Sequence, residues 1–492
     1  MAFVLRTATI LKMAADFHFD VIVPFEAGRA EEILRGVPAG PGVFALCGAR
    51  EGDEPYLTRT ADMRRRMRRL LDPPEAQSKR LNLRDRVARI EYCSTGSEFE
   101  SSLVLYDAAV ALFGYAEARR RLKLHTPYFL RMRMENAFPR VYVTNKLSKR
   151  GLAEMYGPFP SRAAAERYCD AVLDLFKLRR CYEDLQPYPE HPGCIYGDIK
   201  KCMEPCKQAC SDEEYAAEAA AVKRFFDTHG GSMMDAIGLE REVAASAMRF
   251  EEAAVLHERW HKVKAAAALA DELVQPVPKL RAVIVQEAAS SAEQKDAQEA
   301  AVFMLEGGCL VGPERLSTLG VRAVKEQTSV GSSLFAQPLM LAPVPLDGEV
   351  AVEAKDSPEE RAKAVLTKLE GRAAQSHVSE ARHGAPRSGV DVASLSDHLS
   401  LLRRWYYRPE KQRKGEVFFQ NVNHEWPVRR ILRGAARMVL GEPAVMAETN
   451  REGAAEAKVR ILHEGREGVE RVVPVAKGRR SKVSKGSDVS GV

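Results

Sequence analysis

The stretch from Tyr56 to Leu71 places six arginines within sixteen residues, and Asp62 is the only acidic residue between Arg59 and Arg69. From Asp62 onward the pattern is helical, so the arginines surround a helix that cannot neutralise them through local ion pairs. Such a density of positive charge suits a phosphate backbone, although a solvated helix face is the alternative. The segment predicts a phosphate-binding helix with these candidate contacts: Arg59, Arg64, Arg65, Arg66, Arg68 and Arg69.

Four cysteines form a second group with the spacing C-x12-C-x7-C-x3-C: Cys181, Cys194, Cys202 and Cys206. Four thiolates can bind tetrahedral zinc or an iron-sulfur cluster, and the spacing does not decide between them. Unligated core cysteines are the alternative, but the charged "DIKKC" is not a core pattern. Cys210 is a spare thiol near this group, and we expect ordinary buried thiols at the remaining positions: Cys47, Cys93, Cys169 and Cys309.

The composition is that of a globular protein with several domains: 492 residues, 45% apolar, 29% charged and a net charge of +6. The first twenty residues carry charges within their apolar run and offer no small-residue cleavage site. No uninterrupted apolar run approaches the ~18 residues of a membrane span. We therefore expect a cytoplasmic protein, in which cysteines serve as thiols or metal ligands rather than disulfides.

Local patterns predict an α+β fold. Alternation predicts a hairpin of strands over 42–48 and 54–59, then the arginine helix, a strand over 86–93 and a helix over 97–122 opened by a capping box of Ser97 and Glu100. A strand over 140–145 and a helix over 161–180 precede the cysteines, and two helical segments run from 211 to about 271. Further on we expect strands over 280–287, 300–307 and 309–316 and helices near 359–372 and 395–407.

This order resembles the N-terminal half of UvrC, a nucleotide-excision-repair family in which a GIY-YIG nuclease domain, a cysteine-rich segment and a UVR motif follow one another. The resemblance covers about 34–264 and rests on "PGVF", "IEY", "FPRVYVT", "YGPFPS", "CIYGDIKKCMEPC" and "FEEAAVLHERW". It implies these parts: a small GIY-YIG-like α/β domain (34–130), a connecting strand and helix (131–180), a Cys-rich segment (181–230) and a UVR helical hairpin (231–275). Around them we expect an N-terminal extension (1–33), a small α+β C-terminal module (276–445) and a flexible basic tail (446–492).

The resemblance also implies a nuclease site from which several members are missing. Tyr56 matches a catalytic tyrosine, Arg59 stands where the family has lysine, and Arg66 matches the catalytic arginine. Phe44 lacks the hydroxyl of the other tyrosine, Thr58 replaces a glycine, and the metal-binding glutamate falls on Leu105, which cannot coordinate a hard cation. Mg2+ or Mn2+ is expected only if the nuclease is active. Otherwise Arg64, Arg65, Arg68 and Arg69 remain as a DNA-binding surface. In this register neither Glu98 nor Asp107 reaches the metal position.

The cysteines and the hairpin have implied roles as well. UvrC-like proteins carry an iron-sulfur cluster on the matching cysteines, which favours that cofactor over zinc. The segment from Leu239 to Ala266 resembles the UVR motif, which pairs with a UvrB-type protein. Its implied contact face is Phe250, Ala253, Ala254 and Leu256, with a polar rim of Glu251, Glu252, Glu258 and Arg259. A plain intramolecular hairpin would show the same periodicity.

Past about Pro276 the resemblance weakens, because neither an RNase H-like acidic strand end nor paired helix-hairpin-helix glycine motifs are found. We therefore expect no second incision activity. The segment "LRRWYYRPEKQRKGEVFF" predicts either base stacking or an aromatic helix edge over a core, with equal weight. The prediction is a UvrC-like repair protein that binds DNA and a UvrB-type partner. An active excinuclease and a structural adaptor without DNA contact are the alternatives.

Overall fold

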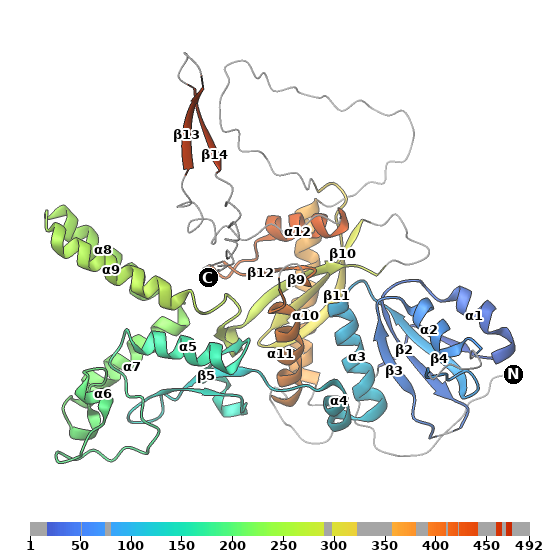
Figure 1. Cartoon of the computed structure of the whole chain (residues 1–492), viewed down its shortest axis with the longest axis horizontal. Helices are drawn as coiled ribbons and strands as arrows, with labels where there is room; N and C mark the ends of the chain where they lie inside the picture. The colour runs from blue at the N-terminus through green and yellow to red at the C-terminus, as the bar shows by residue number, and fades with distance from the viewer. Residues whose placement is uncertain are drawn as a thin grey trace, which may run out of the picture. The chain divides into compact units, whose positions relative to one another are not determined.

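The computed structural model describes residues 17–50, 52–73, 80–289, 298–321, 357–379, 392–409, 412–421 and 423–440 and the strands at 459–464 and 469–474. The chain divides into two compact units, Met1–Glu442 and Pro443–Val492. The larger unit combines small antiparallel sheets with helices (Figure 1), which confirms the predicted α+β class.

The first sheet has the antiparallel strand order β1-β4-β2-β3. Its strands are β1 (Val21–Pro24), β2 (Gly42–Gly48), β3 (Tyr56–Thr60) and β4 (Val87–Ser94). Its helices are α1 (Ala30–Gly36), α2 (Met63–Leu71), α3 (Glu98–Phe113) and α4 (Tyr115–Leu122). Because side chains alternate along a strand, Phe44 and Leu46 pack with α1 and α2, whereas Val43 and Ala45 pack with α3.

The predicted hairpin, arginine helix, strand and following helix are confirmed, with two differences. The strand β1 lies within 1–33, so the sheet begins upstream of the expected domain. The helix over 97–122 is divided at Gly114, whose φ of 78° favours glycine. Ser97 caps α3 as predicted, because its hydroxyl accepts the Glu100 N–H at 3.1 Å.

The second sheet has the order β6-β5-β7-β8 and lies beside the cysteine segment. Its strands are β5 (Tyr128–Met132), β6 (Val141–Thr144), β7 (Met155–Phe159) and β8 (Gln275–Pro276). The accompanying helices are α5 (Arg162–Leu173), α6 (Ile195–Asp198), α7 (Asp212–Asp227), α8 (Gly231–Ser246) and α9 (Phe250–Ala267). Three helices therefore follow Ser211, where two were predicted. Figure 1 shows α8 and α9 as a hairpin that projects from this core.

The C-terminal module is a third sheet, with the order β11-β10-β9-β12, between two layers of helices. Its elements are β9 (Arg281–Glu287), β10 (Glu299–Glu306), β11 (Cys309–Ser317), β12 (Glu416–Phe419), α10 (Pro358–Ser379), α11 (Val392–Tyr406) and α12 (Val428–Leu440). Ile284 and Phe303 face α11, whereas Val283 and Val302 face α10 and α12. The strands and the first two helices were predicted; β12 and α12 were not.

The module packs firmly against α3 and α4. The Phe99 ring centroid lies 5.2 Å from that of Phe303 and 4.8 Å from that of Trp405. Asp397, 0% exposed, lies 2.9 Å from the Arg119 Nε and accepts the Tyr106 hydroxyl at 3.3 Å. This contact brings residues that are almost 300 positions apart in sequence into one buried interface.

In the smaller unit, β13 (Val459–Glu464) and β14 (Val469–Pro474) form an antiparallel hairpin that the expected flexible tail did not include. The rest of 446–492 lies outside the described residues.

Candidate nucleic-acid interface

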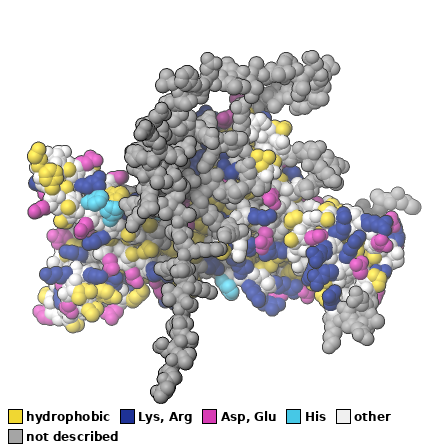
Figure 2. All heavy atoms as spheres, turned by 45° about the horizontal axis from the view of Figure 1, so that its top comes forward, with side chains coloured by type: hydrophobic (Ala, Val, Ile, Leu, Met, Phe, Trp, Pro, Cys, Tyr) yellow, Lys and Arg dark blue, Asp and Glu magenta, His cyan; other side chains and the backbone are white. Residues whose placement is uncertain are grey.

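Helix α2 is positioned by its apolar face. Met63 and Met67 are fully buried against the first sheet, and the Asp62 carboxylate caps the helix by accepting the Arg65 N–H at 2.8 Å. Since the apolar residues occupy one side, the arginines occupy the other. Lys and Arg side chains are frequent on the surface formed by this sheet and its helices, at the right of Figure 2.

The guanidinium groups of α2 lack acidic partners. Within the described residues, none of its five arginines forms an ion pair. Arg64 donates to the Val37 carbonyl at 2.7 Å, whereas Arg65, Arg68 and Arg69 are exposed. An unpaired cluster of like charges on one helix is a surface that a polyanion would stabilise.

Among the predicted catalytic residues, all of which the structure describes, Tyr56 and Arg66 are the two whose side chains contact each other. Arg66 Nη2 donates to the Tyr56 hydroxyl at 3.1 Å. Phe44 is fully buried, and its ring centroid lies 6.4 Å from that of Tyr56. Thr58 is the residue that pairs with Phe44 across the β2–β3 hairpin. The apolar ring of Phe44 therefore stands close to Tyr56 and supplies no hydroxyl.

Leu105 lies over the opposite face of the same hairpin. It packs with Val43, Ala45 and Leu57, whereas Tyr56 packs on the side of Phe44. The ungapped register that assigned the metal-binding position to Leu105 thus leads to an apolar contact between α3 and β2. A carboxylate there would face away from the Tyr56–Arg66 pair.

Arg59 is separated from that pair and belongs to a different network. Its Nη1 lies 2.9 Å from the Glu98 Oε1, and Arg408 approaches the same carboxylate with Nη1–Oε2 and Nη2–Oε1 distances of 2.5 and 2.9 Å. Hydrogen bonds from Arg408 and Arg59 lower the pKa of Glu98 to about 2. Glu98 therefore remains ionised at neutral pH and joins the first sheet to the C-terminal module.

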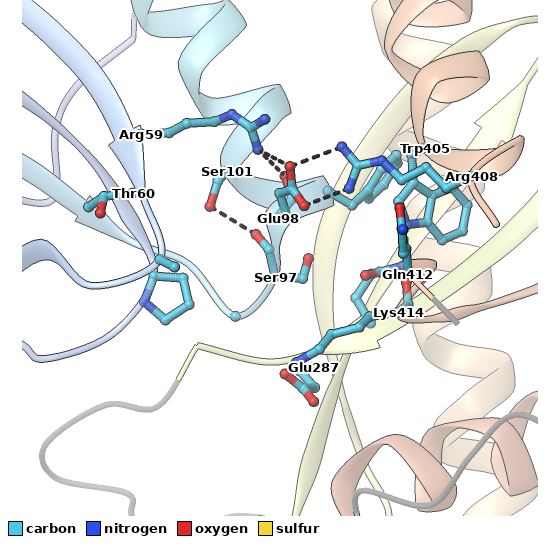
Figure 3. A pocket seen from close by; sticks show the side chains of 15 residues that line it. Arg59, Thr60, Ser97, Glu98, Ser101, Glu287, Trp405, Arg408, Gln412 and Lys414 are labelled. Atoms are coloured by element: carbon cyan, nitrogen blue, oxygen red, sulfur yellow. Dashed lines mark hydrogen bonds and ion pairs between the residues drawn. The ribbon is translucent and has the colours of Figure 1, made fainter. Parts of the chain in front are cut away.

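A cavity of about 560 Å3 opens beside this network, between α3 and the C-terminal module. In Figure 3, Arg59 and Arg408 reach Glu98 from opposite sides. Other side chains of the wall include Trp405, Gln412, Lys414 and Glu287. The N-terminus of α3 also lines it through Ser97. The cavity thus combines cations, amides and the positive end of a helix dipole.

The aromatic-basic segment is core rather than a stacking platform. Trp405 and Tyr406 are 5% and 7% exposed within the module's core. The neighbouring arginines hold other parts of the chain, since Arg403 donates to the Pro160 carbonyl at 2.7 Å and Arg404 to the Leu122 carbonyl at 2.8 Å. Of the two interpretations of this segment, the structure supports the one in which it covers a core.

The four predicted metal ligands lie near one another. Burial, together with smaller contributions from the nearby Cys194, Cys181 and Cys206, raises the pKa of the Cys202 thiol to about 11. In the part of the chain that the structure describes, no three His, Cys, Asp or Glu side chains are arranged to hold a metal ion. The thiols are therefore neighbours without forming a coordination geometry.

A buried cation lies beside these cysteines. Arg179 is 1% exposed, donates to the carbonyls of Phe138 and Glu183 at 2.9 Å each, and has Nη1 3.6 Å from the Cys181 Sγ. Among the described residues no carboxylate forms an ion pair with it. Because buried charges require a counter-charge, the Arg179 guanidinium would stabilise a negatively charged group beside these cysteines.

The other cysteines are mostly inert. Burial raises the pKa of Cys93 and Cys169 to about 12 each, and Cys47 is also buried. Cys210 and Cys309 are half-buried, which differs from the expected full burial of Cys309.

The helical hairpin exposes apolar side chains, though not all the predicted ones. Phe250 is 68% exposed, whereas Leu256 packs against the core of the second sheet and Ala253 is half-buried. Other large apolar residues of α8, α9 and the turn are exposed: Leu239, Val243, Met248 and Val255. Yellow side chains at the left end of Figure 2 mark this hairpin.

Comparisons with known proteins agree with this organisation. Residues 127–225 match the family described as "UvrC/Cho excinuclease, middle domain". The UvrABC system protein C of Alcanivorax borkumensis is 27% identical over 225 residues, which are 46% of this chain and 36% of that protein. The corresponding protein of Acidobacterium capsulatum is 28% identical over 258 residues, covering 49% and 38%. That of Desulforudis audaxviator is 26% identical over 334 residues, covering 65% and 51%.

Over about half of its length, the chain belongs to the UvrC family. The resemblance inferred from the sequence is therefore confirmed. The UvrC middle-domain match includes β5–β7, α5, the four cysteines and α7 up to residue 225. The chain spans only 36% to 51% of the length of these UvrC relatives. No solved structure matches it.

Several residues of the candidate site could not have been found from sequence patterns. Arg408, Gln286 and Lys414 line the cavity beside Ser97 only because the C-terminal module packs on α3.

No described helix is long and apolar enough to cross a bilayer.

Proposed function

We propose that this chain is a UvrC-like nucleotide-excision-repair protein that binds DNA, with a GIY-YIG-like site that no longer cuts it. The observation that carries the proposal is the unpaired arginine face of α2, next to the hydrogen-bonded Tyr56 and Arg66. Phosphates would take the place of the missing acidic partners, and their contacts would position the duplex without reading its sequence.

The inability to cut is supported by what surrounds Tyr56. Phe44 provides a ring but no hydroxyl, and Leu105 is half-buried on the other face of the hairpin. Within the described residues, no carboxylate is hydrogen-bonded or ion-paired to Tyr56 or Arg66. A hard divalent cation would therefore have no such carboxylate as a ligand beside the phosphate-binding arginine.

We also propose that Cys181, Cys194, Cys202 and Cys206 hold an iron-sulfur cluster, with zinc as the alternative. The four thiols lie close together, and the buried Arg179 guanidinium would balance the negative charge of thiolate ligands. A bound cluster would cross-link the loops of this segment and so contribute folding free energy. The polypeptide would contribute the positions of the four cysteine ligands and of the Arg179 guanidinium.

The α8–α9 hairpin is the proposed surface for a UvrB-type partner. A contiguous exposed apolar surface on a soluble protein commonly marks an interaction site. Phe250, Val255 and Met248 would supply its centre, and the acidic residues of α9 its rim. This shifts the proposed contact face away from Leu256, which serves the protein's own core.

The experiment is to incubate the anaerobically purified chain with damaged duplex, a UvrB-type partner and Mg2+ or Mn2+, measuring binding and nicking together. The proposal predicts binding without nicking. Nicking that Arg66→Ala abolishes would instead establish an active excinuclease, the second candidate, which the retained Tyr56–Arg66 hydrogen bond favours. Absence of both would support a structural adaptor.

A further inference from the structure

We propose that the cavity between α3 and the C-terminal module binds a single nucleotide, either the phosphorylated end of a DNA strand or a free nucleoside monophosphate. The strand-end form rests on the proposed DNA binding, whereas the free-nucleotide form does not. Both require a concave site with cations for the phosphate and hydrogen-bonding groups for the base.

The size of the cavity suits one nucleotide. Its volume of about 560 Å3 lies within the range of roughly 300–1,000 Å3 that small-molecule sites occupy. Its wall is formed by two parts of the chain: Pro41, Arg59 and Ser97 from the first sheet and α3, and Trp405, Arg408 and Lys414 from the module. The ligand would therefore be held by groups from both parts (Figure 3).

The charges of the wall favour a phosphate. Two guanidinium groups, of Arg59 and Arg408, share the single carboxylate of Glu98, which leaves an excess of positive charge in this network. Lys414 is exposed and has no ion-pair partner among the described residues, whereas Glu287 is an exposed acid on the rim. The N-terminus of the 16-residue helix α3 adds its partial positive charge.

A buried, unpartnered amide indicates that a ligand group is missing from the wall. Gln286 is 1% exposed and lines the cavity, and its Nε2 has no acceptor among the described residues. A buried donor without a partner is unfavourable, so a ligand oxygen or ring nitrogen would stabilise it. Side-chain amides of this kind pair well with the edges of bases. Gln412 supplies a second amide on the same wall.

The test is isothermal titration calorimetry in phosphate-free buffer with each of the four deoxynucleoside monophosphates, with thymidine, and with an eight-nucleotide single strand carrying or lacking a 5′-phosphate. A matched pair of variants has opposite expected effects. Lys414→Ala should weaken binding on the order of tenfold, as removal of one charge-assisted hydrogen bond does. Glu98→Gln should tighten it several-fold, because it releases two guanidinium groups for the phosphate. Lys279→Ala, an exposed lysine outside the cavity, is the control.

The outcomes separate the two sources and the two proposals. Monophosphate binding that follows the expected order of variants, with thymidine inert, supports the free-nucleotide form. Binding of only the 5′-phosphorylated strand, with the same order, supports the strand-end form. Failure of all these probes overturns the inference even if duplex DNA still binds through α2. Binding whose affinity is unchanged by both Lys414→Ala and Glu98→Gln overturns the inference as well. Urea unfolding of Glu98→Gln checks that the module remains docked.

Discussion

The buried Asp397–Arg119 pair predicts how strongly the C-terminal module is attached to the rest of the larger unit. Asp397 is 0% exposed, and the Arg119 side chain is 31% exposed. Arg119→Met keeps the length of the side chain but removes the cation from a carboxylate that has no access to water. Breaking a buried pair in this way costs about 3 kcal/mol.

Urea unfolding followed by tryptophan fluorescence measures this cost, because Trp405 lies in the core that faces α3. With a urea dependence of ~3 kcal/mol per molar, the transition of the module should shift down by about 1 M. Arg120→Met is the matched control on the same helix, since Arg120 is 75% exposed and pairs only with Glu117 among the described residues, in the turn before it. Its expected cost is below about 0.5 kcal/mol.

A double substitution sharpens the test. Asp397→Leu combined with Arg119→Met replaces both charges by apolar groups and should recover most of the stability that Arg119→Met removes, because the desolvation of the carboxylate is removed as well. The reasoning is refuted if Arg119→Met and Arg120→Met shift the midpoint equally. It is also refuted if the double variant is less stable than Arg119→Met alone by the full cost of breaking a second interaction.

Three further outcomes are expected. Burial raises the pKa of Glu100 above 4.5, so the folded state disfavours the ionised carboxylate, and the free energy of unfolding falls as pH rises from that value. Glu100→Gln should flatten this pH dependence in urea titrations from pH 4 to 8. An unchanged pH profile would contradict the prediction. Cys202→Ser should abolish bound iron and its visible absorbance, whereas Cys210→Ser should retain both; equal metal content in the two variants would exclude the proposed ligand set. Phe250→Asp should weaken binding of a UvrB-type protein on the order of tenfold or more in calorimetry. Thermal stability should not fall, because the Phe250 ring is 68% exposed. A folded variant with unchanged affinity would show that the hairpin is not part of the interface.

Local patterns were sufficient for the elements that present the arginines. The alternation in β2 and β3, the apolar spacing of α2 and the cap at Ser97 are set by neighbouring residues, and all were predicted. The same local reasoning failed at Gly114, because a helical pattern continues on both sides of one residue with a positive φ.

The candidate site was predicted less completely because its contacts are not local. A single sequence register led to Leu105, but α3 packs on the face of the first sheet opposite Tyr56, so Leu105 lies on that face. Arg59 and Arg408 both pair with Glu98, and Arg408 is 310 positions away from Glu98 in sequence. The sequence pattern of the aromatic residues before Arg408 was compatible with base stacking and with packing over a core. Burial of Trp405 against Phe99 supports packing over a core. Side-chain periodicity does not reveal which module covers which helix.

The central claim is that the α2 arginines hold DNA, and the most direct measurement is the salt dependence of duplex binding. In fluorescence anisotropy, the slope of log K against log salt should fall by about 0.9 for each phosphate that the protein no longer neutralises. The triple variant Arg65→Ala, Arg68→Ala, Arg69→Ala should therefore lower the slope by about 2 to 3 and weaken binding at every salt concentration. Arg120→Ala, whose guanidinium is already paired with Glu117, should leave the slope unchanged. A triple variant that binds duplex DNA with the slope and affinity of the unaltered protein would contradict the account.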